Sequence, residues 1–314
     1  MRTTFLAGLM AALLAVPAAA ADYTIMAPAA PGGGWDQTAR TMQEALQAEG
    51  ISGSVQVQNV PGAGGTVGLA QFVSNAAGKP DQLIVGGYVM VGAILTNQSP
   101  VSLADVTPIA RLTGEYEAVV VPAGSDIQDM GQLVERLKAD PGAVSWAGGS
   151  AGGADHIAVG LIAQAAGVDP TRINYIAYSG GGEALAAILG SQVTAGISSL
   201  GEFRAQADAG TLRILAVSAD ARIEGLDVPT FKEAGLDVAM QNWRMVAAAP
   251  GITDDQKAAI SADIERMVQS PTWQEALAAR GWADTYLAGD AFQAQLEQDI
   301  AATDAVLRDI GLVK

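Results

Sequence analysis

Short apolar segments alternate with amphipathic segments along most of the chain, and this alternation constrains the fold more than any other feature. The segments at 23–26, 55–60 and 83–87 have the length and pattern of strands. Between the first two segments, residues 35–48 keep their apolar side chains on one helical face. Strands that alternate with helices in this way are typical of an α/β fold with mainly parallel sheets.

The alternation occurs in two successive units. The run at 118–121 has the pattern of a strand that leaves the first unit, and the run at 245–249 that of a strand that returns to it. Since one hydrophobic core rarely serves a chain of this length, we expect two lobes with a cleft between them. The first lobe is predicted to comprise residues 22–121 and 245–314, and the second residues 122–244. Two chain crossings would let the lobes close by a hinge motion.

Several helices are expected near the C-terminal end. Thr253 and Gln256 have the spacing of a capping box, and Ser270 followed by Pro271 has the order of a cap and a first helical residue. Apolar residues between Phe292 and Leu307 mark the last helix.

The first 21 residues have the pattern of a secretory signal peptide. Arg2 is basic, residues 5–16 are almost wholly apolar, and residues 17–21 are small. The alternative is an N-terminal anchor helix, which the run is too short to favour, because a membrane helix needs about 20 apolar residues. We expect cleavage near Ala21 or Asp22 and a mature protein in the periplasm.

Composition excludes several classes of site. The chain has no cysteine, which rules out disulfides, thiolate metal sites and a lipid anchor on cysteine. With 17 basic and 33 acidic residues, its net charge of −16 argues against nucleic acid or anionic lipid as a partner. Charges are screened beyond about 10 Å in physiological salt, so local groups in a cleft can still bind an anion.

Four glycine-rich loops follow predicted strands and precede predicted helices. They lie at 32–34, 62–65, 148–153 and 180–182. One interpretation is a set of tight turns, in which glycine is the usual residue. The other is an anion clamp, because glycine lets a ligand approach the unpaired amides at a helix N-terminus. A P-loop is excluded, since no such loop ends in Gly-Lys-Ser or Gly-Lys-Thr, and the dinucleotide-binding pattern is not matched.

An esterase is the main enzymatic alternative. Residues 148–152 match the Gly-x-Ser-x-Gly pattern around Ser150, in the required place between a strand and a helix. The only histidine, His156, lies six residues later on the same expected helix, which turns it away from Ser150. One histidine without a thiol also disfavours a metal site.

Five segments together resemble the periplasmic receptors of tripartite tricarboxylate transporters, the Bug or TctC type, and the resemblance extends over essentially the whole mature chain. These segments are 27–36 (APAAPGGGWD), 59–65 (NVPGAGG), 149–153 (GSAGG) with Asp155-His156, 178–185 (YSGGGEAL) and 242–244 (NWR).

The resemblance implies a type II periplasmic binding protein fold whose two lobes close over a carboxylate. It also implies that backbone amides and waters hold the ligand, at loops 30–36, 149–151 and 179–181. The implied partners are a large and a small membrane subunit of an ion-driven transporter. Trp35 and the segment 242–244 look most like the tricarboxylate-binding branch, so citrate is the first candidate ligand.

The sequence thus predicts a monomeric binding protein that is not an enzyme and has no cofactor and no metal. Arg111, Arg204 and Arg244 are either surface salt-bridge residues or, for Arg244, a direct carboxylate clamp. Alternatives to a tricarboxylate receptor are an esterase built on Ser150, a structural or signalling domain, and a dicarboxylate or aromatic-acid receptor of the same fold. The predicted ligand-binding residues are Ala30, Gly33, Gly34, Trp35, Asp36, Tyr88, Gly149, Ser150, Ala151, His156, Ser179, Gly180, Gly181, Ser198 and Arg244.

Overall fold

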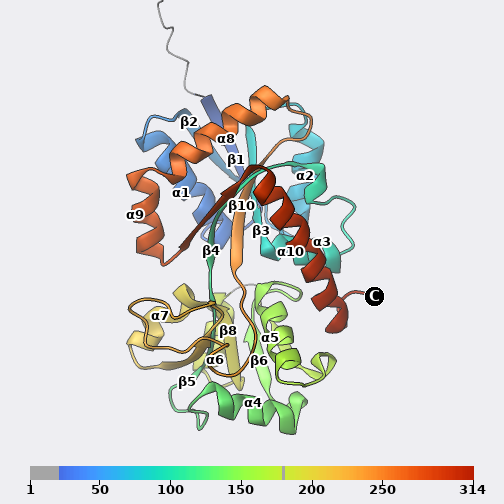
Figure 1. The fold of residues 1–314 in the computed structure, drawn as a ribbon, viewed down its shortest axis with the longest axis vertical. Coiled ribbons are helices and arrows are strands. Elements are labelled where there is room, and N and C mark those ends of the chain that lie inside the picture. The colour runs from blue at the N-terminus through green and yellow to red at the C-terminus, as the bar shows by residue number, and fades with distance from the viewer. Residues whose placement is uncertain (1–20, 179–180) are drawn as a thin grey trace, which may run out of the picture.

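Two β-sheets organise the computed structural model of the protein, which describes residues 21–178 and 181–314. Each sheet is covered by helices on both faces, and the two α/β lobes lie end to end along the long axis (Figure 1). Within the described ranges, no helix is both long enough and apolar enough to cross a membrane.

The first sheet has six strands in the order β11-β4-β10-β3-β1-β2. One face packs against α1, α8 and α9, and the other against α2, α3 and α10, because the strand side chains are apolar on both sides. The elements of this lobe are β1 (Ala21–Ala27), α1 (Gly34–Ala48), β2 (Ser52–Asn59), α2 (Thr66–Ala76), β3 (Gln82–Gly87), α3 (Tyr88–Thr96), β4 (Thr107–Glu115), β10 (Asn242–Ala248), α8 (Asp254–Val268), α9 (Pro271–Arg280), β11 (Ala283–Ala288) and α10 (Gly289–Asp309), with short 3₁₀ turns η1 (Ala63–Gly65) and η2 (Leu103–Asp105).

The second sheet has five strands in the order β7-β6-β8-β5-β9. Helices α4 and α5 cover one face and α6 and α7 the other. The elements are β5 (Glu117–Pro122), α4 (Met130–Ala139), η3 (Pro141–Ala143), β6 (Ser145–Gly148), α5 (Ala154–Ala165), η4 (Pro170–Arg172), β7 (Asn174–Ala177), α6 (Gly181–Leu189), β8 (Ala195–Ser199), α7 (Leu200–Asp208) and β9 (Leu212–Val217).

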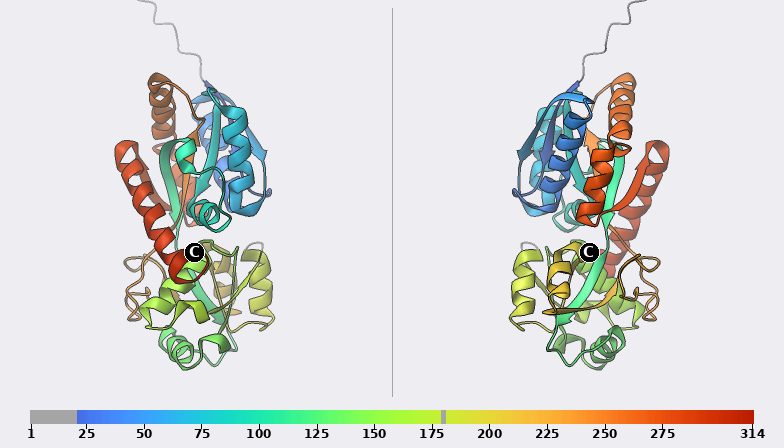
Figure 2. Two further views of the ribbon diagram at one scale, coloured as in Figure 1. Left: turned by 90° about the vertical axis from the view of Figure 1, so that its right-hand side faces the viewer. Right: turned by 90° about the vertical axis from the view of Figure 1, so that its left-hand side faces the viewer.

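The chain crosses between the sheets twice. Only Tyr116 separates β4 from β5, so nearly continuous extended backbone leads from one sheet into the other. The return follows residues 218–241, which leave β9 and come back beside Ser218, where Met240 N–H donates to the Ser218 carbonyl at 3.0 Å. A third connection is made by α10, whose C-terminal end reaches α5 in the second lobe (Figure 2). There Gln164 Nε2 donates to Asp309 Oδ2 at 2.8 Å.

Two expectations need correction at these crossings. The sheets are mixed, not mainly parallel, because the crossing strands run against their neighbours: β5 is antiparallel to β8 and β9, and β10 to β3 and β4. Residues 117–121, expected in the first lobe, pair in the second sheet. Conversely, residues 242–244 pair in the first.

The local capping signals are confirmed. Thr253 and Gln256 form a reciprocal capping box at the start of α8. Ser270 caps α9, with Pro271 as its first residue. Both caps satisfy amides that a helix start otherwise leaves unpaired.

Candidate functional site

The loop before α1 is held in place by Asp36. Its carboxylate accepts hydrogen bonds from Gly32 N–H at 2.7 Å, Arg40 Nε at 3.0 Å and Asn59 Nδ2 at 2.8 Å. Burial opposes ionisation of Asp36, but these hydrogen bonds outweigh it and lower the pKa. All three donors are in the protein, so Asp36 shapes the predicted loop and is not free to bind a ligand.

The first turn of α1 offers backbone amides. Its N-cap residue, Gly33, has no side chain and makes no capping hydrogen bond, while its own N–H donates to the Ala30 carbonyl at 3.0 Å. Ala30 is exposed, and Gly33, Gly34 and Trp35 are half-buried. Uncapped amides at a helix start bind anions, so this turn has the chemistry that the sequence analysis expects.

Arg244 lies directly beneath this turn. A Cβ atom on Gly34 would sit 2.6 Å from Arg244 Nη2, so a larger residue at this position would have to displace the guanidinium. The guanidinium forms an ion pair with Glu115 and lies 4.9 Å from the centre of the Trp282 ring. Its Nη1 lies 3.4 Å from Thr38 Oγ1. Arg244 is therefore a buried, already paired cation.

The open interpretations of the three arginines are now resolved in part. Arg244 is 7% exposed, which contradicts a surface position. Arg204 is an exposed residue paired with Asp208 at 3.5 Å, as a surface salt bridge requires. Arg111 is half-buried, and its Nε donates to the Thr285 carbonyl at 2.9 Å.

In the second lobe, the loop at 148–153 is fixed by the start of α5. Gly149 N–H donates to Asp155 Oδ2 at 2.6 Å, and the Tyr175 hydroxyl donates to the Gly149 carbonyl at 2.9 Å. Gly152 N–H donates to His156 Nδ1 at 3.3 Å, and the imidazole stacks on Tyr175 with ring centres 4.1 Å apart. Burial lowers the pKa of His156 to about 4, so it is neutral at physiological pH.

This geometry does not form a hydrolase triad. The Nδ1 atom of His156 accepts from Gly152, and the neighbouring carboxylate of Asp155 accepts from Gly149. Ser150 is exposed at the loop tip. Among the described residues, no hydrogen bond joins Ser150 to His156, so Ser150 has no base to activate it.

The other predicted residues differ in position. Ser198 is buried at the end of β8, and its hydroxyl donates to Glu202 Oε2 at 2.9 Å. Tyr88 begins α3 and packs edge-on against Trp243 with ring centres 6.2 Å apart. Ala151 is exposed beside Ser150, and Gly181 begins α6. Ser179 and Gly180 lie outside the described residues.

Four acidic residues that the predicted binding set did not include are Glu115, Glu117, Asp155 and Glu202. Glu117 is fully buried, and its carboxyl group shares a hydrogen bond with that of Asp155. Burial, followed by the charges of Asp155, Glu115 and Glu202, raises its pKa well above the ordinary value. Burial also raises the pKa of Asp155 to about 6, with a contribution from Glu202. Glu202 is exposed, and partial desolvation of its carboxyl group is the largest cause of its raised pKa.

A sequence signal for this group did exist. Glu115 and Glu117 flank Tyr116 immediately before the apolar run 118–121. Charged residues next to a buried strand indicate that a partner lies nearby, because burying a charge costs free energy unless the charge is paired.

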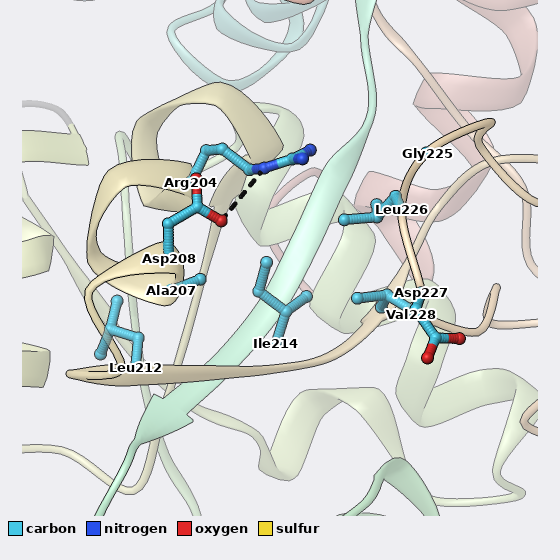
Figure 3. Close-up of a pocket in the computed structure, with 9 residues that line it drawn as sticks. All are labelled: Arg204, Ala207, Asp208, Leu212, Ile214, Gly225, Leu226, Asp227 and Val228. Atoms are coloured by element: carbon cyan, nitrogen blue, oxygen red, sulfur yellow. Dashed lines mark ion pairs between the residues drawn. The ribbon is translucent and has the colours of Figure 1, made fainter.

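Two pockets lie away from the glycine loops. One pocket has a volume of about 390 Å³ and lies next to the two chain crossings. Its lining includes Tyr88, Arg111, Trp243 and Asp299. The other, of about 300 Å³, lies on the second lobe between α7 and the segment after β9 (Figure 3). Tyr88 is the one predicted site residue that lines either pocket. In the described ranges, no group of histidine, aspartate and glutamate side chains could hold a metal ion.

The fold and this site define the class of protein. Two α/β lobes are joined by two crossings, and each lobe contributes an uncapped helix start. That is the architecture of a two-lobed solute-binding protein.

The chain belongs to the tripartite tricarboxylate transporter receptor family, TctC, which it matches over residues 38–312. It is 28% identical to protein BugT of Bordetella pertussis over 310 residues, covering 97% of this chain and 94% of BugT. A UPF0065 protein of Bordetella bronchiseptica is 34% identical over 262 residues, covering 80% of this chain and 75% of that protein.

Solved structures of similar proteins have the same fold. A TctC solute-binding protein from Polaromonas, without ligand, has a TM-score of 0.74 at 25% identity, covering 91% of this chain and 98% of that one. MatC from Rhodopseudomonas palustris with bound malate (TM-score 0.75, 23% identity, 91% and 98% covered) and an R. palustris protein with adipate (0.78, 20%, 92% and 97%) share the fold. These relatives are solute-binding receptors and not enzymes, as expected for this chain.

Proposed function

We propose that the protein, exported by cleavage of a signal peptide near Ala21, binds a small carboxylate in the periplasm between loops 30–36 and 149–151. It then delivers this ligand to a large and a small membrane subunit of a secondary transporter. One observation carries the ligand site: each lobe contributes an uncapped helix start that follows a glycine-rich loop, α1 in the first lobe and α5 in the second. The loop at 179–181 is the third expected contact.

The free energies of the individual interactions indicate that the loops must bind the ligand together. Micromolar affinity corresponds to about 8 kcal/mol. One helix start contributes about 0.3–1 kcal/mol, or up to about 2 when partly buried. Each hydrogen bond to a charged group adds about 1.5–3 kcal/mol. A carboxylate held by one loop alone falls short, so binding and the approach of the two lobes are coupled.

Two ligand classes are candidates. Citrate is suggested by Trp35 and segment 242–244. Fewer carboxylates are favoured because the guanidinium of Arg244 is already paired with Glu115 and also interacts electrostatically with Glu202. Malate and adipate, bound by fold neighbours, are dicarboxylates. We therefore rank a dicarboxylate above citrate.

Titration calorimetry with succinate, malate, adipate and citrate tests this proposal. Gly34→Val should abolish binding by placing a side chain against Arg244 and the α1 amides. Gly124→Val is the matched control, because nothing lies within 4 Å of a Cβ there. The double variant Arg244→Met with Glu115→Gln removes the charged pair together and should retain binding. If only the double variant loses binding, the guanidinium holds the ligand and the amide clamp is wrong.

A further inference from the structure

Tyr175 in the second lobe contacts a predicted ligand loop, although it is not in the predicted binding set. It lies on β7 at the edge of the second sheet, and its register partner on β6 is Trp146. The side chain is half-buried, and its hydroxyl reaches the loop at 148–153, where it donates to the Gly149 carbonyl at 2.9 Å. A side chain from the neighbouring strand therefore holds the backbone of this loop.

The backbone N–H groups of the loop fall into two sets. Those of Gly149, Gly152 and Gly153 donate to groups of the protein. Within the part of the chain that the structure describes, the N–H groups of Ser150 and Ala151 donate to no protein group, and both residues are exposed. Exposed, unpaired N–H groups at a helix start can donate to an anion. The unpaired set is thus the set expected to bind the ligand carboxylate.

The Gly149 carbonyl controls the direction of one of these unpaired N–H groups. Gly149 C=O and Ser150 N–H belong to one peptide unit, which is planar and trans. In such a unit the C=O and N–H bonds point in opposite directions. Because the Tyr175 hydroxyl holds the carbonyl from one side, Ser150 N–H points to the opposite side.

The Tyr175 hydroxyl is itself held in place. Its ring stacks on the His156 imidazole with centres 4.1 Å apart and planes 3° apart. Burial lowers the pKa of His156 to about 4, so the stacked imidazole is uncharged at neutral pH. Burial raises the pKa of Tyr175, so its hydroxyl stays protonated and remains a donor. A Cβ atom at Gly148 would lie 2.4 Å from Tyr175 Oη, so glycine at this position leaves room for the hydroxyl.

We propose that Tyr175 is a positioning residue of the ligand site: by holding the Gly149 carbonyl, its hydroxyl directs Ser150 N–H at the ligand carboxylate. A donor that is already oriented binds an anion more tightly, because less conformational freedom is lost on binding. This inference rests on the proposed function, and it adds a residue that acts on the same site through the loop backbone.

Tyr175→Phe tests this role, because it removes the hydroxyl and keeps the ring that stacks on His156. The ligand is the tightest-binding of succinate, malate, adipate and citrate in titration calorimetry at pH 7.5. The variant should bind it about 2- to 12-fold more weakly than the wild type, the range for the net loss of one hydrogen bond.

Nuclear magnetic resonance locates the effect within the site. In the wild type, the amide proton resonance of Ser150 should move downfield on saturation with the ligand, because its N–H group then donates to a carboxylate. In Tyr175→Phe this movement should be smaller, while the movements of the Gly34 and Trp35 resonances in the first lobe should match those of the wild type.

Tyr23→Phe is the matched control. Tyr23 is buried on β1 in the first lobe, and its hydroxyl donates to Asp263 Oδ2 at 2.7 Å. Both variants lose one tyrosine hydrogen bond, so both should lower the free energy of unfolding in guanidinium chloride. Only Tyr175→Phe should lower the ligand affinity, since a tyrosine with a purely structural role would behave as Tyr23 does.

The outcomes separate this inference from the proposed function. Wild-type affinity in Tyr175→Phe overturns the positioning role and leaves the proposed function intact. An equal loss of affinity in Tyr23→Phe shows a general effect of destabilisation and overturns the positioning role as well. Weakened binding with an unchanged movement of the Ser150 resonance overturns the action through the Gly149 carbonyl. If the wild type binds none of the four carboxylates, the proposed function fails, and this role fails with it.

Discussion

Replacing Asp155 by asparagine should flatten the dependence of stability on pH. The side chain is 8% exposed and keeps its hydrogen bond to Gly149 N–H in the variant, because the amide oxygen still accepts. What disappears is the cost of ionising a carboxyl group in this desolvated place. The perturbation therefore isolates the charge of one carboxyl group.

The sign and size follow from the pKa. The folded-state pKa of Asp155 is raised from 3.8 to about 6. A raised pKa means that stability is fully present below pH 3.8 and is lost as the pH rises through 6. Over the window from pH 4.5 to 7.5, such a shift removes about 2 kcal/mol from the free energy of unfolding. Asp155→Asn should lack this loss.

Guanidinium chloride unfolding at pH 4.5 and 7.5, followed by circular dichroism, measures the difference. Asp255→Asn is the control, since Asp255 is the second residue of α8 as Asp155 is of α5, but is exposed. The control should change between the two pH values as the wild type does. Equal changes in wild type and Asp155→Asn would show that the folded protein does not raise the pKa of Asp155, which would contradict this prediction.

Three further outcomes are expected. Gly92→Ala puts a Cβ 2.0 Å from the Gly152 carbonyl oxygen, so overpacking should lower the free energy of unfolding by about 1–3 kcal/mol in thermal or denaturant unfolding. Gly124→Ala, whose Cβ would meet no neighbour, should leave the free energy of unfolding unchanged. Thr253→Ala breaks the α8 capping box and should cost about 1 kcal/mol by the same assay. A bound ligand should reduce the radius of gyration in X-ray scattering, because the lobes pivot near Tyr116; an unchanged profile at saturation would contradict hinge closure.

The sequence predicted the elements whose signals are local. The strand at 23–26, the helix at 35–48 and the cap at Thr253 each depend on neighbouring residues, and each lies where expected within a few positions. Strand β4 escaped prediction because Pro108 and Arg111 interrupt its apolar pattern.

The sequence predicted the loops of the candidate site but not the side-chain interactions within it. Glycine patterns located the amide turns, because glycine and the following helix are adjacent in sequence. The pairing of Arg244 with Glu115 joins residues 129 positions apart, and no local pattern encodes it. His156 was expected in the binding set, yet its imidazole supports the loop by accepting from Gly152. Roles that depend on such long-range packing appear only in the folded chain.

A co-crystal structure with the tightest ligand of the calorimetric panel tests the central claim most directly. The account predicts a carboxylate within hydrogen-bonding distance of amides from both Gly33–Trp35 and Ser150–Ala151, enclosed between the lobes. A ligand bound in the pocket lined by Tyr88 and Arg111, or held by one lobe alone, would contradict it.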